Sequence, residues 1–136
     1  MADMLRLRIV TPERQLLDEA VDEVTAPGTV GEFGVLPDHV TFLSSLQPGR
    51  LTYKQRGQTR TLAVGGGFAE VADNVMTVLA DSAEFANEID LKRAQNALRK
   101  AEEVLGTLDV TDPTFAEVEA AHRRALARVE IAGGRQ

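Results

Sequence analysis

The chain contains no cysteine and no tryptophan, and only one tyrosine and five phenylalanines among its 136 residues. Without cysteine it forms no disulfide and offers neither a thiolate metal ligand nor a cysteine nucleophile. So few aromatic side chains provide no platform for stacking nucleic-acid bases. The formal net charge of −6 points the same way, because nonspecific binding of nucleic acid needs a basic surface. We therefore expect no nucleic-acid partner.

Long apolar runs are also missing. No segment approaches the roughly 20 apolar residues of a membrane-spanning helix, so we expect any membrane contact to go through a partner. The start of the chain lacks the basic region and the apolar core of a secretory signal. A chain of this length is expected to form one domain, or a small domain with an appendage.

Up to about residue 80 the apolar residues follow a period of two. Leu5, Leu7 and Ile9 alternate with Arg6 and Arg8, which is typical of a half-buried strand. Further short apolar segments are separated by turn pairs such as Pro-Gly and Pro-Asp. These predicted strands are Gln15–Leu17, Val21–Ala26, Thr41–Leu43, Leu51–Lys54, Thr59–Val64, Phe68–Val71 and Val75–Ala80. Many short, closely spaced strands predict an antiparallel β-sandwich over residues 1–84.

After residue 84 the apolar residues recur at alternating steps of three and four, the narrow seam of a helix that packs on one other helix. Gly106 ends the first pattern, and Asp112-Pro113 supplies an N-cap and a proline for the first helical position of the second. The two predicted seams are Leu91, Ala94, Leu98, Ala101 and Leu105, and then Phe115, Val118, His122, Ala125 and Val129. A short connection favours an antiparallel pair.

The sequence thus predicts an α+β fold, in which an antiparallel two-helix hairpin over residues 88–131 follows the sandwich and a frayed tail covers residues 132–136. Seams rich in alanine allow close approach but bury little apolar area. An isolated hairpin of this kind is only marginally stable. It needs the sandwich or a partner to hold it. This is expected of an element that moves in function, and equally of one that is merely weakly stable.

Two groups of glycines invite a phosphate-loop interpretation. The triple Gly65–Gly67 is followed by no Lys-Ser/Thr pair and lies between predicted strands, so it indicates a bulge or a close backbone approach. Gly28, Gly31 and Gly34 predict an irregular turn that needs positive φ. We expect all of them to be structural.

The two histidines, His39 and His122, lie in different segments, and no cysteine completes a ligand set. His122 falls on the second helical seam, which predicts a packed side chain facing the other helix. No Ser-His-Asp set or pair of carboxylates in an apolar setting follows from the spacing. We therefore expect no metal site and no catalytic residue.

The hexapeptide Ile89–Ala94 carries the sharper signal. Asp90, Arg93 and Ala94 occupy adjacent surface positions of a helix through i, i+3 and i+4 spacing. Folding the hairpin about its connection brings Asp90 opposite Arg128 and Arg93 near Arg124. Converging arginines hold phosphates through bidentate hydrogen bonds, and the small alanine leaves room for a base or ribose. The alternative is a plain surface ion pair between Asp90 and Arg128.

Three segments carry a resemblance to a known family: Ala26–His39, Gly65–Val71 and Val75–Glu84. Their order and spacing resemble the epsilon subunit of bacterial F-type ATP synthases, whose mitochondrial counterpart is called delta, from about Leu5 to Val129. The resemblance implies a non-catalytic rotor subunit of the central stalk that couples c-ring rotation to ATP synthesis. Its sandwich would bind the gamma subunit and the c-subunit ring. The candidates for the ring-facing end are Gly31, Glu32, Phe33 and His39.

The same resemblance implies that the hairpin inhibits ATP hydrolysis. Opened, it would extend along gamma and bring a basic cluster, Arg123, Arg124 and Arg128, to acidic loops of the catalytic beta subunits in the alpha/beta head. Charge complementarity would favour that state and salt would weaken it. The alternative is a solvated helix face, since basic residues near a helix C-terminus are favourable anyway.

The hexapeptide resembles the Ile/Leu-Asp-x-x-Arg-Ala motif associated with ATP binding in some bacterial epsilon subunits. The resemblance implies no required cofactor but a regulatory ligand, ATP. The implied ATP-binding residues are Glu84, Ile89, Asp90, Arg93, Ala94, Arg124 and Arg128. Lys100 departs from the pattern, because an ATP-binding relative has an arginine there and lysine lacks the planar fork.

The implied location is the cytoplasmic side of the bacterial inner membrane, with membrane contact only through the complex. The alternative from another class is a free-standing ligand-binding β-sandwich with a dimerising helix pair. It predicts a stable homodimer and no affinity for gamma.

Overall fold

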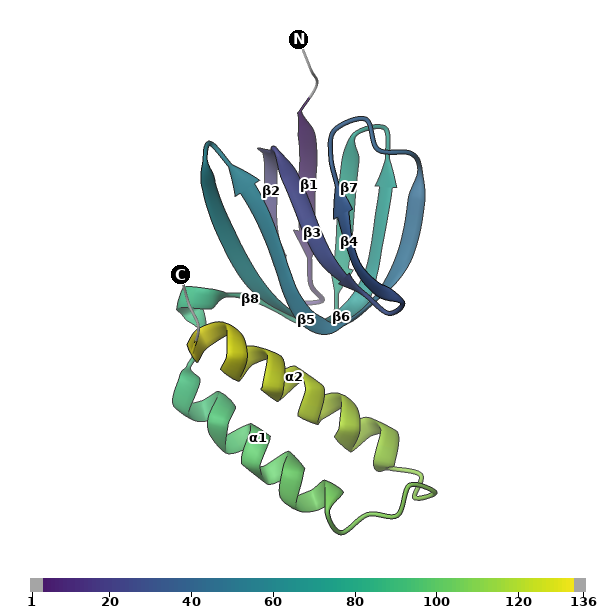
Figure 1. Cartoon of the computed structure of the whole chain (residues 1–136), viewed down its shortest axis with the longest axis vertical. Coiled ribbons are helices and arrows are strands. Elements are labelled where there is room, and N and C mark those ends of the chain that lie inside the picture. The colour runs from purple at the N-terminus through teal and green to yellow at the C-terminus, as the bar shows by residue number, and fades with distance from the viewer. Residues whose placement is uncertain (1–3, 134–136) are drawn as a thin grey trace.

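A computed structural model describes residues 4–133 and shows a β-sandwich standing on a helical hairpin (Figure 1). The strands are β1 (Leu5–Val10), β2 (Gln15–Val21), β3 (Glu23–Gly28), β4 (Gly31–Val35), β5 (Phe42–Gln55), β6 (Gln58–Ala72), β7 (Val75–Ala80) and β8 (Ala83–Phe85). A 3-10 helix, η1 (Ala86–Glu88), leads into α1 (Leu91–Leu105) and α2 (Phe115–Gly133). The predicted α+β fold, a sandwich followed by two helices, is confirmed.

The strands form one continuous sheet in the order β2-β1-β7-β6-β5-β3-β4, and β8 also pairs with β6. Every neighbouring pair is antiparallel except β1 and β7, which are parallel. The predicted antiparallel sandwich is therefore confirmed with the exception of this one pair. The parallel pairing joins two strands that are distant in the sequence, so no hairpin turn announces it.

One predicted turn and one predicted bulge lie inside long strands. β5 and β6 contain 14 and 15 residues, and each merges two segments that the sequence predicts as separate strands. Pro48 on β5 stands opposite Gly65 on β6, and Leu46 stands opposite Gly67. Both strands bend at this level and pass from one layer of the sandwich to the other (Figure 1). Pro48 thus marks a bend and not a chain reversal, and the glycine triple opposite it allows the close backbone approach that the sequence predicts.

The glycines near residue 30 also differ from the prediction of an irregular turn. Gly28 and Gly34 lie in β3 and β4, and only Gly31 of the three has a positive φ, at 142°. Gly31 pairs with Gly28 at the β3–β4 turn. The two glycine-rich strands form a regular hairpin, which the period-two analysis missed because the glycines dilute the apolar pattern.

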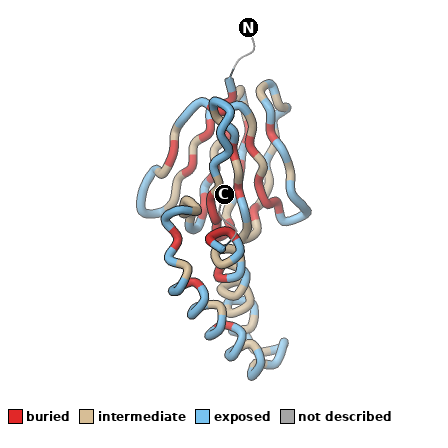
Figure 2. The backbone as a smooth tube through the Cα atoms, turned by 60° about the vertical axis from the view of Figure 1, so that its left-hand side comes forward, coloured by how far each residue is buried: buried red, intermediate tan, exposed pale blue. Residues whose placement is uncertain are grey.

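The core lies between the two layers of the sandwich (Figure 2). Alternate residues of β1, namely Leu5, Leu7 and Ile9, are fully buried, as the period-two pattern predicts. Tyr53 on β5 is the largest buried side chain, with 2 % of its surface exposed. This cluster contains apolar residues from β1 to β7 and none from the helices. The sandwich therefore has its own core.

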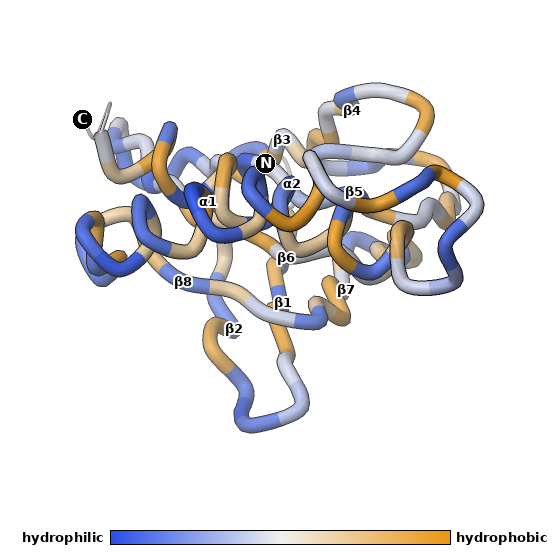
Figure 3. Tube along the Cα trace, turned by 90° about the horizontal axis from the view of Figure 1, so that it is seen from below, coloured by the Kyte–Doolittle hydropathy of each residue, from blue (hydrophilic) through white to orange (hydrophobic). Residues whose placement is uncertain are grey.

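Both predicted helical seams face inward. On α1, Ala94 and Ala101 are buried and the three leucines between and beside them are half-buried, while their neighbours are exposed. α2 lies against the bends of β5 and β6, whereas α1 packs chiefly on α2 and forms the outer layer (Figure 1). Seen from below in Figure 3, hydrophilic and hydrophobic segments alternate along the helices. The three-and-four spacing thus identifies the buried faces correctly.

The helix ends differ slightly from the prediction. The carboxylate of Asp112 accepts hydrogen bonds from the backbone N–H and the hydroxyl of Thr114, and these bonds lower the pKa of Asp112. The helix itself begins at Phe115, two residues after the proline predicted to open it. At the other end α2 continues through Gly133, so the predicted tail begins later than residue 132, and residues 134–136 lie outside the described residues.

Candidate functional site

Two arginines of α2 face the sandwich. Arg128 Nε lies 2.7 Å from Oε1 of Glu84 on β8, and Arg124, one turn earlier, lies over the backbone of β6 at Gly65. A cleft of about 360 Å³ opens between α2 and the lower end of the sandwich. Its lining consists of Thr11, Glu13, Arg14, Ser82, Ala83, Glu84, Arg124 and Arg128. Three of the predicted ATP-binding residues, Glu84, Arg124 and Arg128, therefore meet here.

The predicted pairing of Asp90 with Arg128 is wrong. Asp90 is the N-cap of α1, and its Oδ1 accepts a hydrogen bond of 3.0 Å from the backbone N–H of Arg93. An aspartate just before a helix satisfies an otherwise unpaired N–H group, and this local bond takes the carboxylate that the prediction assigned to Arg128. Arg128 instead pairs with Glu84, which precedes the hairpin.

The alanine of the hexapeptide leaves no room for a base or ribose. Ala94 is fully buried, and it belongs to a small apolar cluster with Ile89, Ala63 of β6, Ile131 and Ala132. Ile89 is 6 % exposed. The predicted site residues Ile89 and Ala94 thus hold the hairpin to the sandwich. Arg93 is exposed on α1 and is not part of the cleft lining.

The charges in the cleft favour an anion. Three arginines converge there against two glutamates, and the buried Nε of Arg128 has no hydrogen bond of good geometry despite its close approach to Glu84. Arginine presents a planar fork of donors suited to phosphate or carboxylate oxygens. Arg14 comes from the β1–β2 turn, which Thr11 closes by donating its N–H to the Arg14 carbonyl at 2.9 Å.

Sequence reasoning missed Thr11, Arg14 and Ser82 as cleft residues. They lie in the sandwich, and their approach to α2 depends on how the hairpin docks, which helical spacing within the hairpin does not report. His122 was placed correctly: its Nε2 lies 3.5 Å from Oε2 of Glu102 on α1, across the seam.

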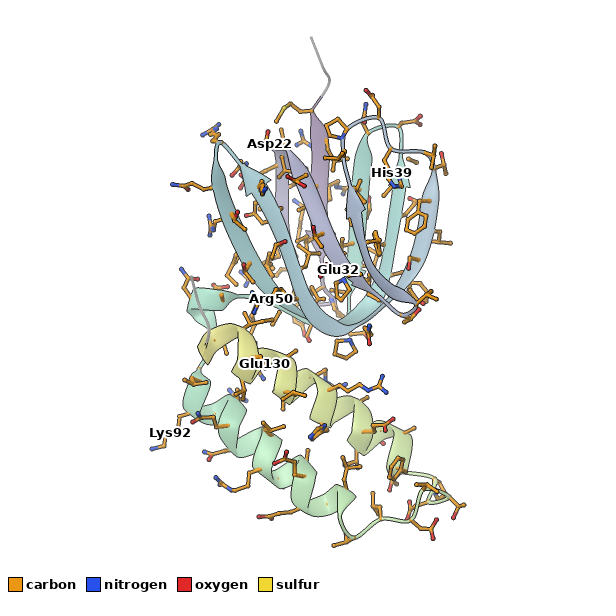
Figure 4. The ribbon with its side chains drawn as sticks, in the orientation of Figure 1. Asp22, Glu32, His39, Arg50, Lys92 and Glu130 are labelled. Carbon is orange, nitrogen blue, oxygen red and sulfur yellow. The ribbon has the colours of Figure 1, made fainter. Side chains whose placement is uncertain are left out.

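The predicted inhibitory cluster is divided in the docked hairpin. Arg124 and Arg128 are half-buried against the sandwich, whereas Arg123 is exposed and pairs with Glu119 at 3.7 Å. Arg123 also lines a second groove, of about 440 Å³, between α2 and the bend of β5. Figure 4 shows Arg50 at the lower end of the sandwich and Glu130 on the helix below it, and both line this groove. The three arginines do not form one exposed surface here.

The candidates for the ring-facing end lie along one edge of the sheet. β4 is the last strand in the sheet order, and it begins at Gly31 and Glu32 and contains Phe33. His39 follows beyond the opposite end of β4, so Glu32 and His39 stand at different heights in Figure 4. The ring of Phe42 contacts both groups: its centroid lies 5.0 Å from that of Phe33 on β4 and 5.7 Å from that of His39 in the loop.

The loop that carries His39 is fixed to the β6–β7 turn. The backbone N–H of Asp38 donates to Oδ1 of Asn74 at 2.5 Å, and Nδ2 of Asn74 donates to Oδ1 of Asp38 at 3.1 Å. Both residues have positive φ, at 67° and 62°. The loop holds two apolar side chains in solvent, Leu36 at 58 % and Val40 at 75 % exposure. A constrained loop with exposed apolar side chains is typical of a contact surface.

A second apolar surface, which the sequence did not reveal, lies on the outer face of the sandwich. Phe68 on β6 stands opposite Leu79 on β7, and Leu43 lies on the neighbouring strand β5. These three side chains are 57 %, 54 % and 70 % exposed. We call them the outer apolar patch. The three residues do not disturb the period-two pattern of their strands, so the pattern does not reveal the patch. The one signal in the sequence is that large apolar residues occupy positions on the solvent face.

Among residues 4–133 no group of acidic or histidine side chains is arranged to hold a metal ion. Within the same residues, no helix combines the length and the apolar character needed to cross a membrane.

Comparison with known proteins gives one consistent family. Residues 4–86 match the model of the ATP synthase delta/epsilon chain β-sandwich domain, and residues 87–133 match that of its long α-helix domain. The chain is 50 % identical over 133 residues to the ATP synthase epsilon chains of Geotalea daltonii and Geobacter sulfurreducens, covering 98 % of this chain and 96 % of each relative. The epsilon chain of Nitratidesulfovibrio vulgaris is also 50 % identical, with 98 % of both chains covered.

Solved structures agree. A chain in the Euglena gracilis mitochondrial ATP synthase assembly of OSCP, F1 and c-ring superposes with a TM-score of 0.81 at 26 % identity, over 95 % of this chain and 81 % of that chain. A chain of the Tetrahymena thermophila central stalk and c-ring shares the fold, with a TM-score of 0.68 at 14 % identity over 96 % and 98 % of the two chains. From the sandwich to the end of the hairpin, this chain belongs to the ATP synthase delta/epsilon family and is a non-catalytic subunit of that enzyme complex.

Proposed function

We propose that the chain is a rotor subunit in the central stalk of an F-type ATP synthase, where it couples rotation of the c-ring to ATP synthesis in the catalytic head. The observation that carries this function is the match of the whole chain, sandwich and hairpin together, to a subunit seen in an F1/c-ring assembly. A coupling subunit needs a stiff body with two contact faces. The sandwich has an independent core, the outer apolar patch and the edge formed by β4.

The outer apolar patch is the proposed contact for gamma. Phe68 and Leu79 are large side chains exposed side by side on a regular sheet face, and burying them against a partner removes apolar area from water. The β4 edge, with Gly31, Glu32, Phe33 and His39, is the proposed face toward the c-ring. The proposed location in a bacterium is the cytoplasmic side of the inner membrane, with membrane contact only through the complex.

A binding assay with gamma tests the first contact. Phe68→Asp should abolish capture of the chain by gamma, because a charge replaces the centre of the patch. Val110→Asp is the matched control, since Val110 is 74 % exposed in the connection between the helices. Undiminished capture of Phe68→Asp would exclude the patch. If the wild-type chain instead formed a stable homodimer that ignored gamma, the rival function of a free-standing dimerising protein would hold.

The hairpin is the proposed inhibitor of ATP hydrolysis. In the docked form only Arg123 of the basic cluster is exposed, so contact of all three arginines with acidic loops of the beta subunits requires release from the sandwich. Because the apolar cluster that holds the hairpin is small and rich in alanine, such release exposes little apolar area and costs little free energy. Truncation after Glu88 should raise the ATPase activity of the assembled complex. Unchanged activity would exclude inhibition by the hairpin.

A third proposed function is ATP sensing, favoured by the arginine-lined cleft. ATP held by Arg124 and Arg128 would bridge α2 to the sandwich, because the cleft exists only while the hairpin is docked. Nucleotide would then shift the population away from the inhibitory form in proportion to its preference for the docked state.

Calorimetric titration of the chain with ATP tests the sensor. Saturable binding that disappears in Arg128→Ala and persists in Arg99→Ala is the expected result, since Arg99 is exposed on α1 and contacts only Asn96 among its described partners. Arg93→Ala separates the two geometries: loss of binding there would extend the site to α1. Absence of any heat at millimolar ATP would leave a coupling subunit whose inhibition does not respond to nucleotide.

A further inference from the structure

The backbone of β6 at Gly65 supports the side chain of Arg124. A Cβ added to Gly65 would lie 3.0 Å from Cδ of Arg124 and would overlap the hydroxyl of Ser82. Gly65 is not one of the glycines with positive φ, so its backbone conformation is open to any residue. The structure therefore favours glycine here for space: the Ser82 hydroxyl occupies the place where a side chain would begin, and the aliphatic stem of Arg124 lies against the bare backbone beside it.

This contact point is rigid on the side of the sandwich. The N–H of Gly65 donates to the Ser82 carbonyl at 2.8 Å, and Gly65 is paired with Pro48 of β5 on its other side. Strand pairing on one side and a backbone bond on the other fix Gly65 in place. When space at Gly65 is filled, the atoms that must give way are the Ser82 hydroxyl and the stem of Arg124, and through Arg124 the conflict reaches α2.

The remaining contacts between the hairpin and the sandwich are modest. The buried cluster contributes Ala63 from the sandwich, against Ile89, Ala94, Ile131 and Ala132. The ion pair of Arg128 with Glu84 is partly exposed, with 29 % and 35 % of the two side chains accessible, so water screens it. A steric conflict at Gly65 therefore acts on an interface that is only weakly stabilised by its other contacts.

We propose that Gly65 is the docking seat of the hairpin: Arg124 lying on a bare strand backbone sets the docked state, and any side chain at position 65 releases the hairpin while both parts stay folded. Its consequence for enzyme activity rests on the proposed inhibitory role of the hairpin. The docking equilibrium itself is a property of the isolated chain and is tested there.

Distances between two spin labels measure docking. The chain has no cysteine, so Thr59→Cys on β6 and Glu117→Cys in the first turn of α2, both exposed, give unique attachment sites. We expect one narrow distance in the parent chain. Gly65→Ala should lower the docked-to-released ratio by about tenfold, as overpacking of this kind predicts, and add a broad, longer distance. Gly34→Ala is the matched control, because its Cβ would meet only the Val24 carbonyl oxygen at 3.9 Å.

Combined variants separate the two neighbours of Gly65. Gly65→Ala with Ser82→Ala removes the hydroxyl overlap and leaves the conflict with Arg124, so the hairpin should stay released. Adding Arg124→Ala removes this conflict, so the docked fraction should rise to the level of Arg124→Ala alone. Restoration by Ser82→Ala alone would overturn the role of Arg124.

A variant that leaves the sheet untouched covers the case in which Gly65→Ala fails to fold. Arg124→Ala should also lower the docked fraction, whereas Arg99→Ala on α1 should not. Unchanged distances in Arg124→Ala would refute the docking seat. If docking responds as expected but the ATPase activity of the complex does not change, the seat stands and the proposed inhibitory role fails.

Discussion

Tyr53 is the only tyrosine of the chain, which also lacks tryptophan, so its ionisation can be followed without interference. Burial raises the pKa of the Tyr53 phenol above its ordinary value of 10.0, Arg60 opposes this shift and Glu19 adds to it. The neutral phenol is thus favoured in the folded state. Phenolate absorbance should rise with a midpoint above pH 10 in the native protein and return to the ordinary value in urea.

The raised pKa has a consequence for stability at alkaline pH. The contribution of Tyr53 is fully present below the unfolded pKa near 10.0 and is lost as the pH rises through the folded pKa, because the unfolded chain releases its proton first. Arg60→Ala should move the native midpoint further upward, since it removes the cation that favours phenolate. Lys54→Ala is the control. A downward shift in Arg60→Ala would contradict this electrostatic assignment.

At the scale of elements, alanines set how closely α1 approaches its surroundings. Ala94 is fully buried, with 0 % of its surface exposed to water, so Ala94→Leu forces extra carbon atoms into a filled space. We expect a loss of about 1–3 kcal/mol in the free energy of unfolding. Ala97→Leu, on the exposed face of the same helix, should stay within about 0.5 kcal/mol. Urea unfolding followed by helical circular dichroism measures both. Equal stability of the two variants would show that Ala94 has room beside it.

The elements also show how far the sequence reaches. Both helical seams could be predicted because three-and-four spacing is a local property of the helix. The merging of strands into β5 and β6 could not, because a proline at 48 and a glycine triple at 65 indicate breaks between strands until the two positions are known to face each other. The same limit applies to the site. Glu84, Arg124 and Arg128 were identified by resemblance, yet their contacts with each other and with Arg14 depend on docking, which no periodicity encodes.

At the scale of the whole molecule, the sandwich and the hairpin differ in how much buried apolar core stabilises each of them. The buried cluster of the sandwich lies within residues 5–80, and only Ala63 of the sandwich is buried in the cluster that includes hairpin residues. Each helix depends on the other and on that small cluster. The outer apolar patch and the β4 edge belong to the sandwich alone. The proposed contacts with the rotor do not involve the hairpin and would therefore persist while it moves.

This asymmetry predicts the behaviour of fragments. The fragment of residues 1–88 should fold and lose on the order of 1 kcal/mol of stability, mainly by exposing the Ala63 side chain. The fragment of residues 89–136 should show little helix, because a short hairpin with alanine seams is marginal in water. Thermal unfolding and the raised pKa of Tyr53, measured by phenolate absorbance, report on the first fragment. Circular dichroism reports on the second. A fragment 1–88 that unfolds on isolation would mean that the hairpin completes the sandwich. The effect of truncating the hairpin on ATPase activity would then reflect a damaged rotor contact and not the loss of an inhibitor.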